Sequence, residues 1–330
     1  MKRTPRFLAR GIERIKARLS KSLRISRMQI LILAILTMMG IVSLLSPNFL
    51  TVQNQVNVLE QLSIDAVVAA GMTLVIISGG IDLSVGAVLA LGSMGTAALM
   101  VRGIPIPIAI VAGVCVGLGI GAINGLAIAV GRVPAFVMTL GMMNIARGTV
   151  LYLTGGKSIW GFPEEFEFLA KGSVGPVPML IIVTGAVYLS LHLLLTRTRF
   201  GRYTFAIGNS EEVSRLLGVR VRLHKLKLYA LCSGMAVFSG ILLSSRMNSA
   251  QTLAGTGQEM DVIAAVVIGG TSLYGGTGSM VGTLLGVYFL RLVHNSLNLL
   301  GVSPFLQDVS VGALLVLSAL ADVISHRLRK

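Results

Sequence analysis

The sequence predicts an all-α integral membrane protein with about ten transmembrane helices, some of them discontinuous, and one short cytoplasmic helix. Of its 330 residues, 54% are hydrophobic and only 12% are charged. The mean hydropathy of +0.84 is too high for an ordinary soluble domain. Ten apolar windows come close to the roughly 17 to 25 residues that cross a bilayer. Basic residues gather at both ends and in one central segment, which is typical of a multi-pass topology.

The expected spans begin directly after a basic N-terminal segment, 1–27. The apolar run that follows it has no convincing small-residue cleavage site, so we expect an uncleaved first span and not a signal peptide. The ten windows are 28–46, 61–78, 83–101, 107–130, 135–154, 179–196, 227–245, 259–274, 280–300 and 305–325. Together they predict one transmembrane domain, 28–325, surrounded by membrane lipid.

The basic residues set the expected orientation. Of the 28 Lys and Arg residues, ten lie within 1–27, eight lie between Arg197 and Lys227, and three lie in the last four residues. Such charge marks the cytoplasmic side, so we expect cytoplasmic termini, 1–27 and 326–330, and a cytoplasmic loop, 197–226. An even number of spans places both termini on one side, and ten spans, with the sixth ending at Arg197, also place the central loop on that side. Few aromatic residues lie between the cations to stack on bases, so the net charge of +15 does not predict nucleic-acid binding.

The central loop contains a stretch, 209–218, that is typical of a short helix. Asn209 is expected to cap it, Glu212 follows three residues later, and Gly218 is expected to end it. At about 1.5 Å per residue, this helix is too short to cross a bilayer. The apolar residues expected on one of its faces are Val213, Leu216 and Leu217. From the residues alone, this face either folds back on the membrane domain or docks on a separate cytoplasmic protein.

Glycine interrupts the expected spans at two matched places, 78–84 and 275–279. At a spacing of 196 residues, the matched pairs are Asp65 with Asp261, Gly79 with Gly275, Gly80 with Gly276, Gly86 with Gly282, and Leu89 with Leu285. Paired broken segments in the two halves of a transporter indicate its pathway, because interrupted backbone is tolerated only beside protein or a water-filled cavity. The match is short, and both copies are expected to run in the same direction.

Glycines also recur every four residues, which leaves one helix face without side chains and lets a neighbouring helix approach closely. We expect a packing role for these glycines, which are Gly113, Gly117, Gly121 and Gly125 in the fourth span and Gly282 and Gly286 in the ninth.

Polar side chains inside the spans are candidates for function, because each is costly in hydrocarbon unless it is paired. Arg147 and Arg291 can pair with acidic residues across the bundle. The acidic residues near span ends are Asp65, Asp82, Glu259 and Asp261. The neutral amides, which suit a sugar's hydroxyls because they both donate and accept, are Asn124, Asn295, Asn298 and Gln307.

The sequence predicts no catalytic residues and no metal site. Its four histidines lack metal-binding spacing, and Cys115 and Cys232 are isolated from one another. The run 156–158, Gly-Lys-Ser, lacks the earlier glycine of a phosphate-binding loop, since Leu151 stands there. We therefore expect no nucleotide site of its own, so uphill transport would take its energy from an ion gradient or from another subunit.

Several motifs in order resemble those of the ribose-type permeases, the membrane subunits of bacterial ABC importers for monosaccharides and related solutes. The motifs are GMTLVI at 71–76, GIDLSVG at 80–86, RFGRY at 199–203, AGTG at 254–257, IAAVVIGGTSL at 263–273 and NLLGVS at 298–303. The resemblance covers about residues 28–325. Asp308 and Ser296 depart from the family's pattern near the expected exit of the path, which leaves the identity of the solute open.

The resemblance implies a permease homodimer in the bacterial inner membrane, although the sequence does not distinguish it from a heterodimer. It further implies a periplasmic sugar-binding protein and a cytoplasmic ATPase subunit that holds ATP and magnesium, with no cofactor on the permease itself. The solute would be a ribose-like pentose, a hexose or a polyol. The helix at 209–218 would be the coupling helix that docks on the ATPase.

We expect two functional groups of residues on this basis. The residues expected along the solute path are Asp82, Ser84, Asn124, Asn295 and Asn298. Those expected to couple the permease to the ATPase are Gly208, Asn209, Glu211, Glu212, Arg215 and Gly218. A proton-coupled secondary transporter is the alternative, but it needs acids near the bilayer centre, and most acids here lie near span ends. A membrane enzyme needs a clustered nucleophile and base, which the sequence does not offer.

Overall fold

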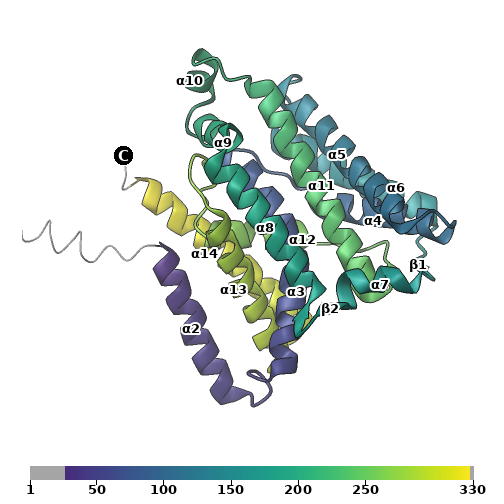
Figure 1. Cartoon of the computed structure of the whole chain (residues 1–330). Coiled ribbons are helices and arrows are strands. Elements are labelled where there is room, and N and C mark those ends of the chain that lie inside the picture. Colours follow the sequence, from purple (N-terminus) through teal and green to yellow (C-terminus); the bar gives the residue numbers. More distant parts are fainter. Residues whose placement is uncertain (1–26, 328–330) are drawn as a thin grey trace, which may run out of the picture.

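The computed structural model describes residues 27–327 as a bundle of helices, which confirms the all-α prediction (Figure 1). Of the basic segments expected at the two ends, residues 1–26 and 328–330 lie outside this range. The helices are α2 Arg27–Leu45, α3 Val52–Ile77, α4 Val85–Val101, α5 Ile106–Ala129, α6 Ala135–Thr154, α7 Glu164–Lys171, α8 Met179–Arg197, α9 Arg199–Asn209, α10 Glu211–Leu216, α11 Val221–Met247, α12 Gln258–Ile268, α13 Met280–Leu299 and α14 Pro304–Arg327.

Four two-residue strands complete the described chain. They are β1 Ile159–Trp160, β2 Ser173–Val174, β3 Val177–Pro178 and β4 Ser249–Ala250. β1 pairs antiparallel with β4, and β2 pairs antiparallel with β3. The β1–β4 pair joins the segment after α6 to the segment after α11, at the end of the bundle that also holds α7 (Figure 1).

Each of the ten expected spans coincides with a helix, but some expected boundaries are wrong. α3 begins at Val52 and not at 61, because Thr51 caps a first turn of polar residues that hydropathy does not detect. α11 likewise begins at Val221, inside the expected loop 197–226, most of which is helical. α12 ends at Ile268 after 11 residues, because Gly269 and Gly270 turn the chain there, the latter with φ +93°.

Among residues 27–327, seven helices are long and apolar enough to cross a membrane, namely α2, α3, α5, α6, α8, α11 and α14. α4, with 17 residues, and α12, with 11, are shorter and are the helices that follow or precede a glycine break. A multi-pass membrane protein whose interior contains broken helices is therefore the observed architecture.

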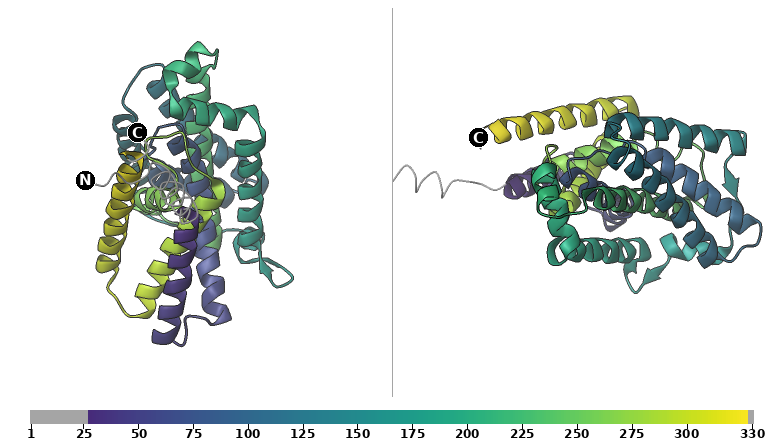
Figure 2. Two further views of the ribbon diagram at one scale, coloured as in Figure 1. Left: turned by 90° about the vertical axis from the view of Figure 1, so that its left-hand side faces the viewer. Right: turned by 90° about the horizontal axis from the view of Figure 1, so that it is seen from above.

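α3 forms the centre of the core. Every residue from Leu62 to Ile77 is buried, as expected for a helix that is apolar on all sides and surrounded by other helices. α8, α11, α12 and α13 pack around it. α10 lies at one end of the bundle, and the α2–α3 and α13–α14 connections lie at the opposite end (Figure 2).

The predicted packing glycines lie where helix backbones meet. A Cβ atom at Gly117 would lie 2.7 Å from the carbonyl oxygen of Ser233, and one at Gly125 would lie 2.6 Å from the Cα atom of Leu226, both on α11. Gly121 faces the same neighbour and Gly113 faces α4, and Gly282 and Gly286 of α13 face the backbone of α12. Alanine would not fit these faces without moving a helix.

Candidate functional site

The two glycine breaks, 196 residues apart in the sequence, meet in space. The backbone N–H of Gly276 donates to the carbonyl of Ile77, the last residue of α3, at 2.8 Å. Gly208, near the end of α9, lies against both, since a Cβ atom there would be 2.5 Å from the Gly276 nitrogen. The end of α9 is therefore in direct backbone contact with both broken helix pairs.

The short helix expected at 209–218 is smaller in the structure. α10 covers Glu211–Leu216, and Ser210 caps it by accepting a hydrogen bond from the Val213 N–H at 3.2 Å. Asn209 is instead the last residue of α9, where its Nδ2 donates to the Phe205 carbonyl at 2.8 Å. The expected helix 209–218 with an Asn209 cap was therefore wrong, because the adjacent serine supplies the capping oxygen three residues before Val213.

Ion pairs hold α10 against the start of α11. Glu211 accepts from Arg215 at 2.9 Å and from Lys225 of α11 at 2.5 Å. The hydrogen bond from Lys225 lowers the pKa of the Glu211 carboxyl below its ordinary value. Glu212 is exposed, and Gly218 follows the helix in a left-handed conformation with φ +82°.

α9 is fixed to α11 by an aromatic and polar contact. The Thr204 hydroxyl lies 2.9 Å from Nε2 of His224, and the ring of Phe200 lies 4.6 Å from the His224 ring, centre to centre. Together with the Glu211 pairs, these contacts join α9 and α10 to α11 as one unit, the α9–α10 unit, which also contacts the two glycine breaks through Gly208.

The apolar face of α10 is exposed. Val213 is 53% exposed, Leu216 is 81% exposed and Leu217 is 77% exposed. These three side chains, which we call the α10 apolar face, lie on the outermost helix of this end of the molecule (Figure 1). Within residues 27–327 nothing covers them. Exposed apolar residues grouped within a polar segment indicate a docking surface for another protein.

Three of the residues predicted along the path come together after α3. Asp82 Oδ1 accepts hydrogen bonds from the Ser84 N–H at 2.9 Å and from the Ser84 hydroxyl at 2.6 Å. Asn124 Nδ2 of α5 donates to the same hydroxyl at 3.1 Å, and the Ser233 hydroxyl of α11 donates to Asp82 at 3.5 Å. All four side chains are completely buried. In this conformation the cluster braces the start of α4 against α5 and α11.

The other two predicted path residues lie elsewhere. Asn295 of α13 and Asn54 of α3 exchange two side-chain hydrogen bonds of 2.8 and 3.0 Å. Asn298 is exposed near the end of α13. Asn54 is near the start of α3 and Asp82 follows its end, so about 35 Å of helix, at 1.5 Å per residue, separates the two groups.

A further polar group joins α3, α12 and α13. Arg291 Nε donates to Asp65, and its Nη2 lies 3.9 Å from Asp261. Gln258 Nε2 donates to Asp65 at 2.9 Å, and His294 lies 3.7 Å from Asp261. Sequence reasoning did not place this group on the path and did not single out Gln258. The signal that could have found it is the 196-residue match of Asp65 with Asp261.

Arg147 does not pair directly with an acid. Its Nη1 donates to the backbone carbonyls of Thr252 at 2.7 Å and Ala254 at 3.0 Å, and so fixes the segment before α12. Among the described residues, no three His, Cys, Asp or Glu side chains gather into a group that could hold a metal ion.

Comparisons with known proteins identify the family. Residues 54–319 match the family described as "Branched-chain amino acid transport system / permease component". The ribose import permease protein RbsC of Escherichia coli (strain K12) is 43% identical over 297 residues, which are 88% of this chain and 92% of RbsC. The chain belongs to this permease family.

Other relatives of the permease have similar coverage. RbsC of Bacillus subtilis (strain 168) is 42% identical over 86% of this chain and 88% of its own length. The D-allose transport system permease protein AlsC of E. coli (strain K12) is 36% identical over 84% of this chain and 86% of its own length. No solved structure gives a significant match. The chain is thus a ribose-type ABC permease, a multi-pass inner-membrane transport component and not an enzyme.

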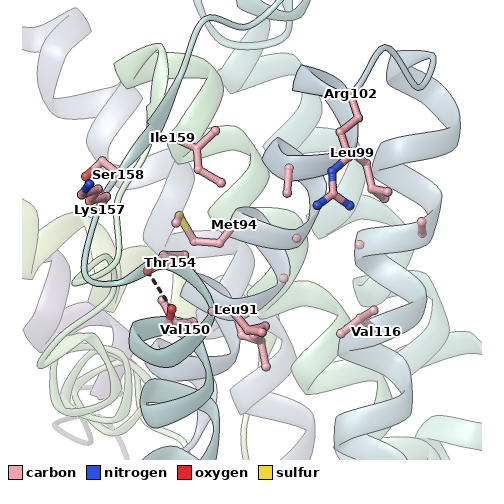
Figure 3. A pocket seen from close by; sticks show the side chains of 16 residues that line it. Leu91, Met94, Leu99, Arg102, Val116, Val150, Thr154, Lys157, Ser158 and Ile159 are labelled. Atoms are coloured by element: carbon pink, nitrogen blue, oxygen red, sulfur yellow. Dashed lines mark hydrogen bonds between the residues drawn. The ribbon is translucent and has the colours of Figure 1, made fainter.

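The largest cavity that we describe does not suit the solute path of this permease. It has a volume of about 710 Å³ and lies among α4, α5, α6 and β1. Its walls are mainly apolar and include Leu91, Met94, Leu99, Val116 and Val150 (Figure 3). Because such walls offer a hydroxylated solute few hydrogen-bond partners, we do not place the path here.

Proposed function

We propose that the chain is the membrane subunit of an ABC importer that carries a monosaccharide, a ribose-like pentose, a hexose or a polyol, across the bacterial inner membrane. The names of its relatives, ribose import permeases and a D-allose permease, support a neutral sugar as the solute. The observation that carries the proposal is the exposed α10 apolar face, held by ion pairs on a unit that contacts both broken helix pairs.

The energy comes from a separate cytoplasmic ATPase subunit, which binds ATP and magnesium. α10 is the coupling helix, and its apolar face docks on this ATPase. When the ATPase dimer closes on ATP, the motion passes through α9 to Gly208, which touches the end of α3 and the break at Gly276. Because both broken pairs meet there, a small displacement of α9 moves both together.

Two identical permeases form the path between an external sugar-binding protein and the cytoplasm. The basic segments 1–27 and 326–330 and the α9–α10 unit are cytoplasmic under the positive-inside rule, so the end with α7 and β4 is periplasmic. The Asp82 cluster then lies toward the cytoplasmic side and Asn295 toward the periplasmic side. In the conformation described, the buried Asp82 cluster closes the cytoplasmic side of the path.

The test is solute uptake into proteoliposomes that contain the permease with its ATPase, supplied with the binding protein outside and ATP inside. We expect uptake of radiolabelled D-ribose or D-allose that requires ATP and persists when an uncoupler collapses the proton gradient. Uptake that stops with the uncoupler while ATP is held constant would instead support a proton-coupled transporter. In that mechanism the carboxylates of Asp65 and Asp261 would be the proton carriers.

A further inference from the structure

A second cavity lies at the end of the bundle opposite α10. It is an open cavity lined by α3, α11, the segment before α12, α12 itself and α13, and its volume is about 290 Å³. Arg246, next to the last residue of α11, lines it, whereas α10 lies near the first residue of α11. The cavity is close to the small end of the range for ligand sites, roughly 300 Å³. We call it the outer polar cavity.

The lining of the outer polar cavity is rich in hydrogen-bonding groups and balanced in charge. Six of the polar residues that line the cavity are Gln61, Asp65, Arg246, Gln258, Asp261 and Arg291. Two of them are acids and two are arginines. The arginines offer only donors and the carboxylates only acceptors, while a hydroxyl group can act as both. A solute with several hydroxyls could therefore bind both kinds of group.

The charges in this cavity already have partners. Arg291 pairs with Asp65 and lies 3.9 Å from Asp261, and the Nε atom of Arg246 lies 3.3 Å from Glu60. An ionic solute would have to displace one of these pairs, which would leave a charge without a partner in a poorly hydrated place. A neutral solute leaves the pairs in place and bonds to their remaining donor and acceptor positions. The charge balance therefore favours a neutral solute.

Gln258 supplies the observation that points to a missing ligand. The side chain is only 9% exposed, and its Nε2 donates to Asp65 at 2.9 Å. Its Oε1 atom is buried and receives no hydrogen bond from residues 27–327. Buried acceptors without a donor are rare and unfavourable. Gln258 lines the cavity, so a rotation of its side chain that turns this oxygen toward the cavity would let a hydroxyl bound there donate to it.

We propose that the outer polar cavity is the site where the permease receives a neutral polyhydroxylated solute from the periplasmic side. The inference rests on the proposed function, since it names where the carried sugar is first held. Gln258 is also the first residue of α12, whose other end leads to the break at Gly276. Because α12 has only 11 residues, a solute in the cavity contacts the same short helix that leads toward Gly208.

The decisive experiment is protection of an engineered thiol in the assembled complex. Thr256 lines the cavity and is exposed, and its hydroxyl bonds only to the nearby Leu253 carbonyl, so T256C leaves the ion pairs intact. The matched control is L253C, which is 64% exposed in the same segment but does not line the cavity. Both variants carry C115S, which removes the exposed native thiol. The reagent is a membrane-impermeant methanethiosulfonate, and D-ribose and D-allose are the sugars tested.

We expect modification of T256C to stop sugar uptake, and free sugar without the binding protein to slow this modification. Modification of L253C should be unaffected by sugar and should leave uptake intact. If sugar fails to slow the modification of T256C, or if the modified variant still takes up sugar, the outer polar cavity is not the receiving site. Wild-type uptake driven by ATP would then still support the proposed function.

A second readout uses Gln258 itself. Q258L removes the orphaned acceptor together with the Nε2 donor to Asp65, so uptake at low sugar should fall by at least about five- to tenfold, the value of one hydrogen bond. ATP hydrolysis stimulated by the binding protein should persist. Q251L makes the same change at an exposed residue outside the cavity and should match wild type. Equal uptake by Q258L and Q251L would overturn the site. Failure of the wild type to take up any of a panel of neutral sugars and polyols would overturn the proposed function and this inference together.

Discussion

Replacing Gly121 by alanine should force α5 away from α11. A Cβ atom there would lie 2.7 Å from the Ala230 Cα atom and 2.7 Å from the Tyr229 carbonyl carbon, and closer still to the Tyr229 oxygen. Carbon atoms pack at about 3.5 to 4.0 Å, so the backbones must separate by roughly 1 Å. Such overpacking costs about 1 to 3 kcal/mol. Because both contacts are backbone atoms, no side-chain rotation can relieve them.

Gly119, two residues away on the same helix, provides the matched control. A Cβ atom there meets nothing within 4 Å, so alanine should stabilise the helix by up to about 1 kcal/mol through its better propensity. The gain in propensity applies to both variants, so they should differ in free energy of unfolding by the overpacking cost, about 1 to 3 kcal/mol.

Thermal unfolding of the purified permease in mild detergent measures this difference. Cys232 is completely buried on α11, so a thiol-reactive dye labels it only on unfolding, once exposed Cys115 has been replaced by serine. We expect G121A to lower the midpoint of labelling and G119A to leave it unchanged or raise it. Equal midpoints would refute the close packing of α5 on α11.

Three further changes test other contacts. G208A should leave the protein folded but reduce the sugar moved per ATP hydrolysed, because its Cβ would press on the Gly276 nitrogen; G141A, with nothing within 4 Å, should behave as wild type. E211Q removes the carboxylate that anchors α10. A partly exposed ion pair contributes about 0.2 to 1 kcal/mol, so coupled ATPase activity should fall by the modest factor that corresponds to this energy. Since the folded-state pKa of Glu211 is lowered, wild-type coupling should hold at neutral pH and fall only as the pH drops through that lowered pKa, whereas E211Q should lack this acid step. N295L should lower the dye-labelling midpoint by leaving Asn54 Oδ1 without its donor, at a cost of about 1 to 3 kcal/mol, and the double variant with N54L should recover part of this loss.

Hydropathy predicts the helices well because a lipid environment requires long apolar stretches. It fails at the start of α3, where Gln53, Asn54 and Gln55 are polar yet helical. The sequence also offers two adjacent residues, Asn209 and Ser210, that could cap the helix after them. In the structure α9 extends through Asn209, so Ser210 caps α10.

The candidate site was less accessible to sequence reasoning. Asp82, Ser84 and Asn124 were selected as separate polar residues, and their hydrogen bonds depend on how α4 and α5 cross. The pairing of Arg291 with Asp65 joins residues 226 positions apart. No local pattern in one sequence encodes such a contact. Only the matched spacing of the two glycine breaks indicated that distant segments meet.

The α10 apolar face offers the most direct test of the central claim that α10 couples this permease to an ATPase. The measurement is co-purification of ATPase activity with the permease from its native membrane in mild detergent. The variant changes Val213, Leu216 and Leu217 to serine, and the control changes Leu253, an equally exposed residue at the opposite end of the bundle, to serine. We expect wild type and L253S to retain the ATPase and the triple variant to lose it while keeping its unfolding midpoint. An ATPase that still co-purifies with the triple variant, or a wild-type permease that moves sugar into liposomes without any ATPase, would contradict this account.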